Sequence, residues 1–298
     1  MALDYRGFSH GGSVLYPVDK TAYSDVVHDS VSPFDLNLFS DAWTRESQLP
    51  QPDITWTENT GSTNDDLAAA AESGSAAPFS ILGTDHQQAG RGRLARTWTT
   101  PPRTCLTFSI AVPVPPTAAA DDLGWIPLIT GRAVVDALRA EGVPAELKWP
   151  NDVLIRDRKL AGILTRIVIG ADGAKTVVIG TGINVHLAQE DLPVETATSL
   201  LVEGFDFSRE VLLAAVVSRL REALDSAFSR PAVGTAEFCA DMSDSMATIG
   251  RDVRVELPGR EPLTARAVGL DAQGGLVIET SEGLQTVTAG DVVHARLV

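Results

Sequence analysis

The segment from Thr84 to Trp98 contains the side chains of this chain that are best suited to bind a small anion. Glycine has no Cβ, so backbone N–H groups can approach a ligand closely, and an arginine guanidinium binds carboxylate or phosphate oxygens two at a time. We therefore expect this segment to bind a compact anion through oriented N–H groups at Gly90 and Gly92 and through the side chains of Gln87, Arg91, Arg93, Arg96 and Trp98.

This arginine cluster runs against the charge of the whole chain. The sequence has 39 Asp and Glu against 24 Lys and Arg, a formal net charge of −15. Such a field repels polyanions like duplex DNA, whose binding rests on many phosphate contacts. We expect a small anionic ligand and no nucleic-acid partner.

A second polar group, Ser62-Thr63-Asn64, lies at a predicted turn from a strand into a helix. Ser62 is a good N-cap, with Asp65 in a capping-box-like position three residues later. The three residues are either no more than a helix cap or a set of donors and acceptors that binds a polar ligand head, and both readings stay open.

Lysine is rare in this chain, with four residues at positions 20, 148, 159 and 175. Two of them fall between Leu147 and Thr165, where strands alternate with turns at Pro150-Asn151-Asp152 and at residues 157–158. Lys148 either contacts a ligand or only supports its strand. Gly162, among apolar residues of a predicted strand, indicates close approach of a ligand or of another backbone.

The elements that must position these residues follow from hydrophobic periodicity. We predict strands at residues 53–58, 79–84, 105–113 and 175–185, and helices at 123–140 and 207–228. The connection from Asp85 to Arg103 is long, so we expect a binding loop that is mobile without ligand and orders around it. The Gly180-x-Gly182 pair lacks a third glycine and a following helix, which excludes a dinucleotide-binding fingerprint.

The two ends of the chain differ from its middle. Residues 1–49 are acidic and without sustained periodicity, so we expect a flexible extension with one short helix that places Leu36, Phe39 and Trp43 on one side. Nothing in it resembles a helix-turn-helix. From about residue 249 five short strands predict a small barrel, so the expected domains are 1–49, 50–246 and 247–298.

The sequence also predicts where in the cell the protein acts and how its cysteines behave. No run approaches a membrane span, and the first residues lack the order of a signal peptide, so we expect a cytoplasmic protein without a membrane partner. Cys105 and Cys239 are too few for a disulfide framework or a zinc site, and we expect them to act as small hydrophobes.

With these segments in view, the chain resembles the bacterial biotin protein ligases over roughly residues 50–298. Ala95 stands where the family often has glycine, and no winged-helix repressor domain is seen in front, so the resemblance is to the form without it. The similarity lies in the motifs Ser62-Thr-Asn64, Gln87 to Arg93, Lys148-Trp-Pro-Asn-Asp152, Lys159-Leu-Ala-Gly-Ile-Leu164 and Gly180-Thr-Gly-Ile-Asn-Val185.

The resemblance implies an α/β (α+β) fold: a mixed central sheet flanked by helices, like that of class II synthetases, with a small C-terminal SH3-like β-barrel. It also implies two half-reactions. Biotin and ATP, with Mg²⁺, give biotinyl-5′-adenylate, and biotin then passes to one lysine of a biotin carboxyl carrier protein. Loosening the 85–103 segment is expected to release the reactive adenylate.

The same resemblance assigns roles to matched positions. As catalytic residues it implies Arg93, Lys159 and Asp152, with Asp152 as the candidate base for the acceptor lysine. Biotin would contact Ser62, Thr63, Asn64, Gln87, Gly90, Arg91, Gly92, Arg93, Lys159 and Gly162. The nucleotide would contact Arg91, Arg93, Arg96, Trp98, Asn151, Lys159 and Asn184, with Trp98 stacked on adenine. The metal ligand stays open between Asn151 and Asp152.

Other functions were weighed against this one. A lipoate or octanoate ligase shares the fold, but the polar Ser-Thr-Asn and Gln87 set favours a ring with urea-like edges over an acyl chain. A non-catalytic sensor would not need Lys159. The C-terminal barrel is either an interaction module or simply packs on the catalytic domain.

Overall fold

A seven-stranded mixed sheet forms the centre of the molecule in the computed structural model, which describes residues 31–93, 96–229, 233–256, 261–288 and 291–294. The first two strands are parallel and the other neighbours pair antiparallel. Across the sheet the order is β1 (Ile54–Thr60), β2 (Ile81–Gln87), β5 (Cys105–Pro113), β9 (Lys175–Asn184), β8 (Arg158–Ile169), β7 (Asp152–Ile155) and β6 (Ala145–Lys148).

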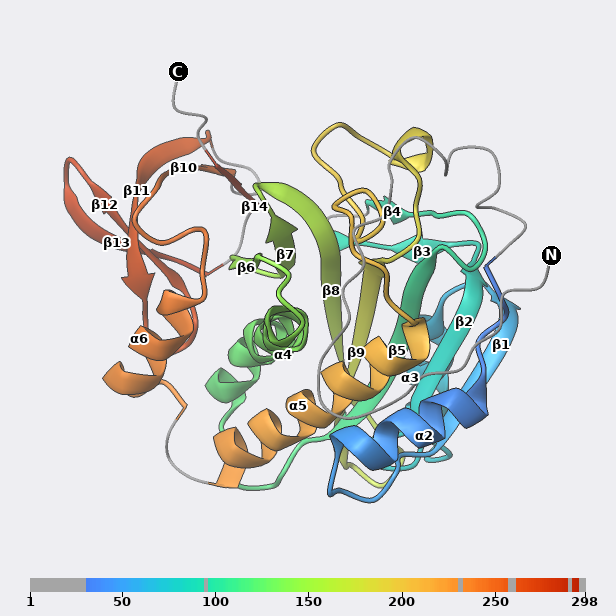
Figure 1. Ribbon diagram of the computed structural model, residues 1–298. Coiled ribbons are helices and arrows are strands. Elements are labelled where there is room, and N and C mark those ends of the chain that lie inside the picture. The colour runs from blue at the N-terminus through green and yellow to red at the C-terminus, as the bar shows by residue number, and fades with distance from the viewer. Residues whose placement is uncertain (1–30, 94–95, 230–232, 257–260, 289–290, 295–298) are drawn as a thin grey trace.

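The sheet is flanked by helices, as the resemblance implied, and these helices cover both of its faces (Figure 1). On one face α3 (Thr63–Glu72) packs a small apolar cluster that includes Leu67 and Ala71 against Ala111 and Val178. The other face carries the main core under α4 (Ile126–Ala140) and α5 (Arg209–Ser229), and α2 (Leu36–Glu46) packs on α5. The predicted helices and strands of the middle of the chain are confirmed.

Local sequence explains where these helices begin and end. Ser62 caps α3 by accepting a hydrogen bond from the Asp65 N–H at 3.3 Å, and acidic residues follow in the first turn, where the helix dipole favours them. Pro127 lies in the first turn of α4, which follows the short 3-10 helix Ala120–Trp125. Gly142 terminates α4 with φ of 78°, in the left-handed region that suits glycine.

The N-terminal region is more ordered than expected. The predicted helix exists, and Phe39, Ala42 and Trp43 are buried in the main core. Leu36, which we placed on the same side, is instead 44% exposed. The expected flexible extension was therefore wrong for residues 34–46, because aromatic side chains at this spacing find an apolar partner in α5; residues 1–30 lie outside the described part of the chain.

The long connection between β2 and β5 also differs from the expectation of an irregular loop. It contains a two-stranded hairpin of β3 (Gly90–Arg91) and β4 (Thr97–Trp98), in which Gly90 pairs with Trp98 and Arg91 with Thr97. The cluster of arginines is thus carried on an arm with its own backbone hydrogen bonds; residues 94–95 lie outside the described residues.

The C-terminal part contains the five predicted short strands, which form an antiparallel sheet in the order β13 (Gly283–Val287), β12 (Leu276–Thr280), β11 (Leu263–Leu270), β10 (Asp252–Glu256) and β14 (Asp291–His294). Helix α6 (Ala236–Asp244) and two tryptophans join it to the rest. The indole of Trp125 donates to the Ala272 carbonyl and that of Trp149 to the Gly274 carbonyl, each at 3.0 Å. Packing on the domain of the seven-stranded sheet is therefore one role of this sheet.

Two further expectations concern membranes and thiols. Among the described helices, none is both long and apolar enough to cross a membrane. Both cysteines are free; Cys105 is buried, whereas Cys239 is only partly covered.

Replacing Phe39 by alanine should lower the free energy of unfolding by about 3–5 kcal/mol, because a fully buried aromatic side chain leaves a cavity under α2. Leu36→Ala on the same helix is the matched control and should change it by less than about 0.5 kcal/mol, since that side chain faces solvent. Urea denaturation monitored by circular dichroism measures both, and equal effects would contradict the packing of α2.

Candidate functional site

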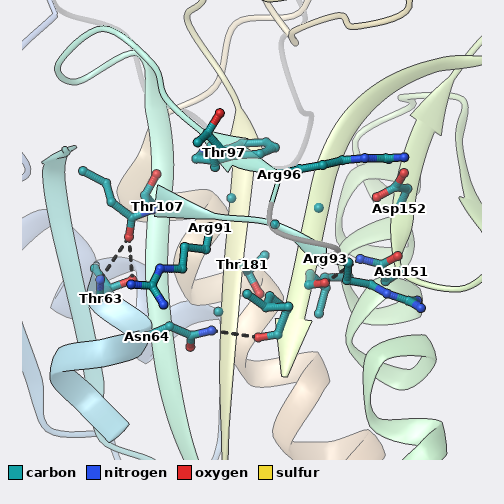
Figure 2. A pocket seen from close by; sticks show the side chains of 18 of the residues that line it. Thr63, Asn64, Arg91, Arg93, Arg96, Thr97, Thr107, Asn151, Asp152 and Thr181 are labelled. Carbon is teal, nitrogen blue, oxygen red and sulfur yellow. Dashed lines mark hydrogen bonds between the residues drawn. The ribbon is translucent and has the colours of Figure 1, made fainter. Parts of the chain in front are cut away.

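A cavity of about 140 Å³ lies beneath the β3–β4 hairpin, on the face of the sheet that carries α3 (Figure 2). Its walls come from the start of α3, the hairpin, and strands β5, β7, β8 and β9. Most of the residues that sequence analysis selected line it, namely Thr63, Asn64, Gln87, Arg91, Gly92, Arg93, Arg96, Trp98, Asn151, Asp152, Lys159 and Gly162.

Glycines of two neighbouring strands form the floor of this cavity. Gly162 of β8 pairs directly with Gly182 of β9, and the indole of Trp98 lies over both. A Cβ on Gly182 would be 2.7 Å from ring atoms of Trp98, closer than van der Waals contact allows. The groups that approach Gly162 closely are the side chains of Trp98 and Lys159, not another backbone, and the approach of a ligand stays a prediction.

Lys159 is held in place both by its side chain and by its backbone. Its Nζ lies 2.6 Å from Oδ1 of Asp152 and 5.9 Å from the ring centre of Trp98. Its N–H donates to the Thr196 carbonyl at 2.7 Å, and its own carbonyl accepts from Thr198 N–H at 2.8 Å. A half-exposed ammonium on a fixed backbone can meet an anion that enters the cavity.

Behind Lys159 lies a buried carboxylate that sequence analysis did not identify. Glu203 binds Arg156 at 2.7 Å, Arg158 and the Thr198 hydroxyl, and its side chain is fully buried. Arg158 directly precedes Lys159, and Thr198 contacts its carbonyl. Glu203 thus supports the strand segment that presents the lysine. No local signal marks Glu203, because its partner Arg158 lies more than forty residues away along the chain.

At the start of α3 a chain of polar contacts organises the opposite end of the cavity. Gln87 Oε1 accepts from the backbone N–H of Thr63 at 3.0 Å and from its hydroxyl at 3.3 Å. The Ser109 hydroxyl contacts Thr63 Oγ1 at 2.8 Å and Asn64 Oδ1 at 3.1 Å, and Asn64 Nδ2 donates to the Leu164 carbonyl. Ser109 was missed because it lies inside an apolar strand.

Three predicted biotin contacts have a structural role in this arrangement. Ser62 is buried and caps α3, so the plainer of its two readings holds for its side chain. Gly90 is needed for packing, since a Cβ there would lie 2.3 Å from Gln87 Nε2 and from the Trp98 carbonyl. The N–H of Gly92 donates to the Arg96 carbonyl at 2.7 Å, so the expectation of a ligand-directed N–H at Gly92 was wrong.

The hairpin arginines point to different ends of the cavity (Figure 2). Arg91 extends toward α3, where its guanidinium lies 3.7 Å from Asp65, and Arg93 extends toward Asn151. Arg93 and Asn151 also line a second cavity of about 440 Å³ that adjoins the first and reaches the C-terminal sheet at residues 273–275. An extended ligand therefore has room on both sides of Arg93.

Asn151 and Asp152 offer oxygen atoms beside Lys159. The amide Nδ2 of Asn151 donates to the Ile163 carbonyl at 2.7 Å, which directs its oxygen away from that bond. Among the described residues no group of three or more His, Cys, Asp or Glu side chains is arranged to hold a metal ion by itself.

Asn184 was expected to contact the nucleotide, but it is not one of the described residues that line the cavity. It is buried, donates from Nδ2 to the Thr198 carbonyl at 2.8 Å and accepts from the Cys105 thiol at 3.4 Å. Its amide therefore ties β9 to the segment that holds Lys159. Burial raises the pKa of Cys105 to about 12, so this thiol is not a nucleophile near neutral pH.

Family models match two parts of the chain. Residues 60–184 match the biotin/lipoate A/B protein ligase family, and residues 248–295 match the biotin protein ligase C terminal domain. The first range contains the cavity walls from Thr63 to Gly182, and the second contains the C-terminal sheet.

Individual proteins agree with these models. The biotin–[acetyl-CoA-carboxylase] ligase of Mycobacterium tuberculosis is 39% identical over 244 residues, which cover 80% of this chain and 87% of the relative. The bifunctional ligase/repressor BirA of Escherichia coli is 30% identical over 70% of this chain and 64% of its own length. The structure of the Aquifex aeolicus biotin protein ligase with biotin and ATP superposes with a TM-score of 0.68 at 29% identity, covering 82% of this chain and 99% of that one. The chain therefore belongs to the biotin protein ligase family.

Proposed function

We propose that this protein is an ATP-dependent biotin protein ligase, which joins biotin to ATP as biotinyl-5′-adenylate and then transfers biotin to a lysine of a biotin carboxyl carrier protein. The observation that carries the proposal is the position of Lys159. Its ammonium, paired with Asp152, lines the same cavity as the polar group at the start of α3 and the hairpin arginines.

Polar groups at the start of α3 suit the ureido ring of biotin. Thr63, Asn64 and Gln87 line the cavity there and carry hydroxyl and amide groups. The Ser109 hydroxyl lies within hydrogen-bond distance of both Thr63 Oγ1 and Asn64 Oδ1, and these contacts favour one rotamer of each before any ligand arrives. A ring with one carbonyl and two N–H groups can use the hydrogen-bonding capacity that these groups keep beside their internal contacts, whereas an acyl chain cannot. Biotin is thus favoured over lipoate or octanoate.

The first half-reaction requires positive charge between two anions. A carboxylate and an α-phosphate 4 Å apart repel by about 1 kcal/mol in water and about 4 kcal/mol at a protein-like effective dielectric. Lys159 and Arg93 supply the opposing charge on the cavity wall, and Lys159 is held by Asp152 and by its backbone. Because these groups are already oriented, they need not reorganise during the reaction. Arg91 and Arg96 complete the positive arm.

Trp98 and the second cavity suit the nucleotide. The indole lies on the glycine floor beside Lys159 and lines the cavity, where an adenine can stack on it. The adjoining cavity past Arg93 and Asn151 offers space for the phosphates. Asn184 is left out of the proposed contacts because its amide is engaged with Thr198 and Cys105.

The donor set also fits a magnesium ion that arrives with ATP. Mg²⁺ is commonly bound by one or two protein oxygens together with substrate phosphates and water. The amide oxygen of Asn151 and the carboxylate of Asp152 lie on the cavity wall and would hold it. When bound, such an ion neutralises phosphate charge.

Asp152 is the predicted base for the acceptor lysine in the second half-reaction, and this stays a prediction. Its ion pair with Lys159 supports a second role, which is to orient the lysine ammonium, because the two groups are only 2.6 Å apart. Free lysine has a pKa near 10.4, so the acceptor must lose a proton before it attacks the adenylate.

Pyrophosphate release should depend on biotin and on Lys159. With MgATP, the wild type is expected to release pyrophosphate with biotin but not with lipoate or octanoate, and Lys159→Ala should lower kcat by about 10²–10³-fold, as removal of one preorganised electrostatic group does. Lys175→Ala at the exposed start of β9 is the control. Release with lipoate alone would transfer the assignment to the lipoate ligases, and no release with any of these acids would favour a sensor.

Gly182→Ala should weaken ATP binding, because its new methyl group displaces Trp98 from the floor. Loss of one aromatic stacking contact of about 1–3 kcal/mol would raise the KM for ATP about fivefold or more. Gly61→Ala is the matched control, since a Cβ there meets nothing within 4 Å. A folded Gly182→Ala enzyme with the KM of the wild type would contradict the stacking role.

A further inference from the structure

The arm that carries the arginines leaves the sheet after β2 and returns before β5, and its two ends meet at Asp85 and Arg103. The N–H of Arg103 donates to the Asp85 carbonyl at 2.7 Å, and Arg103 adopts a left-handed φ of 67°. The position of Arg91 and Arg93 over the cavity depends on how this meeting point is held.

The carboxylate of Asp85 is shared among three segments at this point. Its Oδ1 accepts from the Arg209 guanidinium of α5 at 2.8 Å and from the Trp56 indole of β1 at 3.0 Å, and its Oδ2 lies 3.8 Å from Arg103 Nε. Only 5% of the Asp85 side chain and 2% of the Arg209 side chain are exposed. A buried carboxylate between two guanidinium groups fixes one arrangement, because any other leaves a charge without a partner.

Asp85 is on the opposite side of the sheet from the ligand cavity. Thr84, the preceding residue, pairs with Thr107, which lines the cavity, and successive side chains of a strand point to opposite faces. Asp85 instead points toward the start of α5, where Arg209 lies. Any influence of Asp85 on catalysis must therefore pass through the hairpin.

The N-terminal segment before α2 covers this pair. The Ser32 carbonyl accepts from Arg209 at 2.9 Å, and the Phe34 ring lies 6.0 Å from the Arg209 guanidinium. Phe34 also stacks on Trp56, with ring centres 3.6 Å apart. Residues 32–34 thus contact two of the three partners of the Asp85 carboxylate, Arg209 and Trp56, beside an ion pair that is almost fully buried.

We propose that Asp85 and Arg209 are positioning residues for the catalytic hairpin, and that residues 32–34 of the N-terminal region belong to this fastening. The proposal rests on the ligase function proposed above, since the hairpin carries Arg91 and Arg93. Breaking the pair leaves the hairpin in its competent position for only part of the time, which weakens the apparent affinity for biotin and lets the adenylate escape.

The first test is Asp85→Asn in the full chain, a substitution that keeps the shape and the acceptor for Trp56 but removes the charge facing Arg209. If the hairpin is then competent about a tenth of the time, the KM for biotin rises about tenfold, while kcat at saturating biotin changes by less than about threefold. Asp136→Asn, which weakens a partly buried ion pair with Arg132 away from the hairpin, is the matched control and should leave both constants unchanged. A folded Asp85→Asn enzyme with the wild-type KM would overturn the proposal.

A double variant separates positioning from stability. Asp85→Asn leaves Arg209 buried without its partner, so the single variant can lose stability for that reason alone. Asp85→Asn/Arg209→Met removes both charges and should regain much of the thermal stability while the raised KM persists. If KM returns to the wild-type value together with the melting temperature, the pair only stabilises the fold and the proposal fails.

The contribution of residues 32–34 is tested by Phe34→Ala against Phe39→Ala. Both remove an aromatic side chain from the same region, but in this pair only Phe34 contacts Arg209 and Trp56. Phe34→Ala should raise the KM for biotin several-fold, and Phe39→Ala should lower stability without that change. Equal KM values in the two variants would remove the N-terminal region from the proposal.

Amide hydrogen exchange distinguishes failure of this proposal from failure of the ligase function. Without any substrate, Asp85→Asn should speed exchange in peptides covering residues 85–103 and leave peptides of the C-terminal sheet unchanged. This result would stand even if the wild type released no pyrophosphate with biotin. Unchanged exchange in the hairpin peptides would refute the fastening whatever the enzyme's activity.

Discussion

The absence of side chains at Gly162 and Gly182 is the packing constraint on which the site depends. These residues are directly opposite each other on β8 and β9, so together they open a flat area of bare backbone on the sheet. Trp98 lies on that area, and Lys159 reaches across Gly162 toward Asp152. Gly180 permits the same close approach to Asn64, whose amide joins α3 to β8. A methyl group at these positions would push away the residues proposed to contact the substrates.

Cationic side chains around this floor are paired with carboxylates. In a chain of net charge −15, three cationic side chains at or behind the cavity, Lys159, Arg91 and Arg158, have carboxylate partners. Asp152 holds Lys159, Asp65 lies beside Arg91, and the buried Glu203 holds the strand behind Lys159 through Arg158. Each carboxylate orients a cation without covering the cavity, so the positive charge remains available to a carboxylate and a phosphate brought together there.

The two faces of the sheet carry different parts of the structure. One face presents the cavity, α3 and the hairpin, whereas the other carries the main core and the Asp85–Arg209 ion pair. The two ends of the hairpin meet at Asp85 and Arg103, and Asp85 also pairs with Arg209 on the core side. Through these residues the packing of the core contacts the base of the hairpin. The C-terminal sheet closes the far end of the adjoining cavity, held by hydrogen bonds from Trp125 and Trp149.

Local patterns in the sequence were enough to predict the helices, the strands, the five C-terminal strands and most of the cavity walls, because alternation, caps and glycine positions act over a few residues. Contacts between distant segments could not be predicted in this way. The Asp85–Arg209 pair spans 124 positions and the Ser109–Asn64 contact spans 45, and each partner looks ordinary in its own neighbourhood. The same limit explains the errors at Gly92, whose N–H bonds within a hairpin, and at Asn184, which faces a buried carbonyl. Residue type and spacing thus indicated the chemistry. Only tertiary packing decided which polar groups remain available for a ligand, because buried donors and acceptors form hydrogen bonds with each other within the protein.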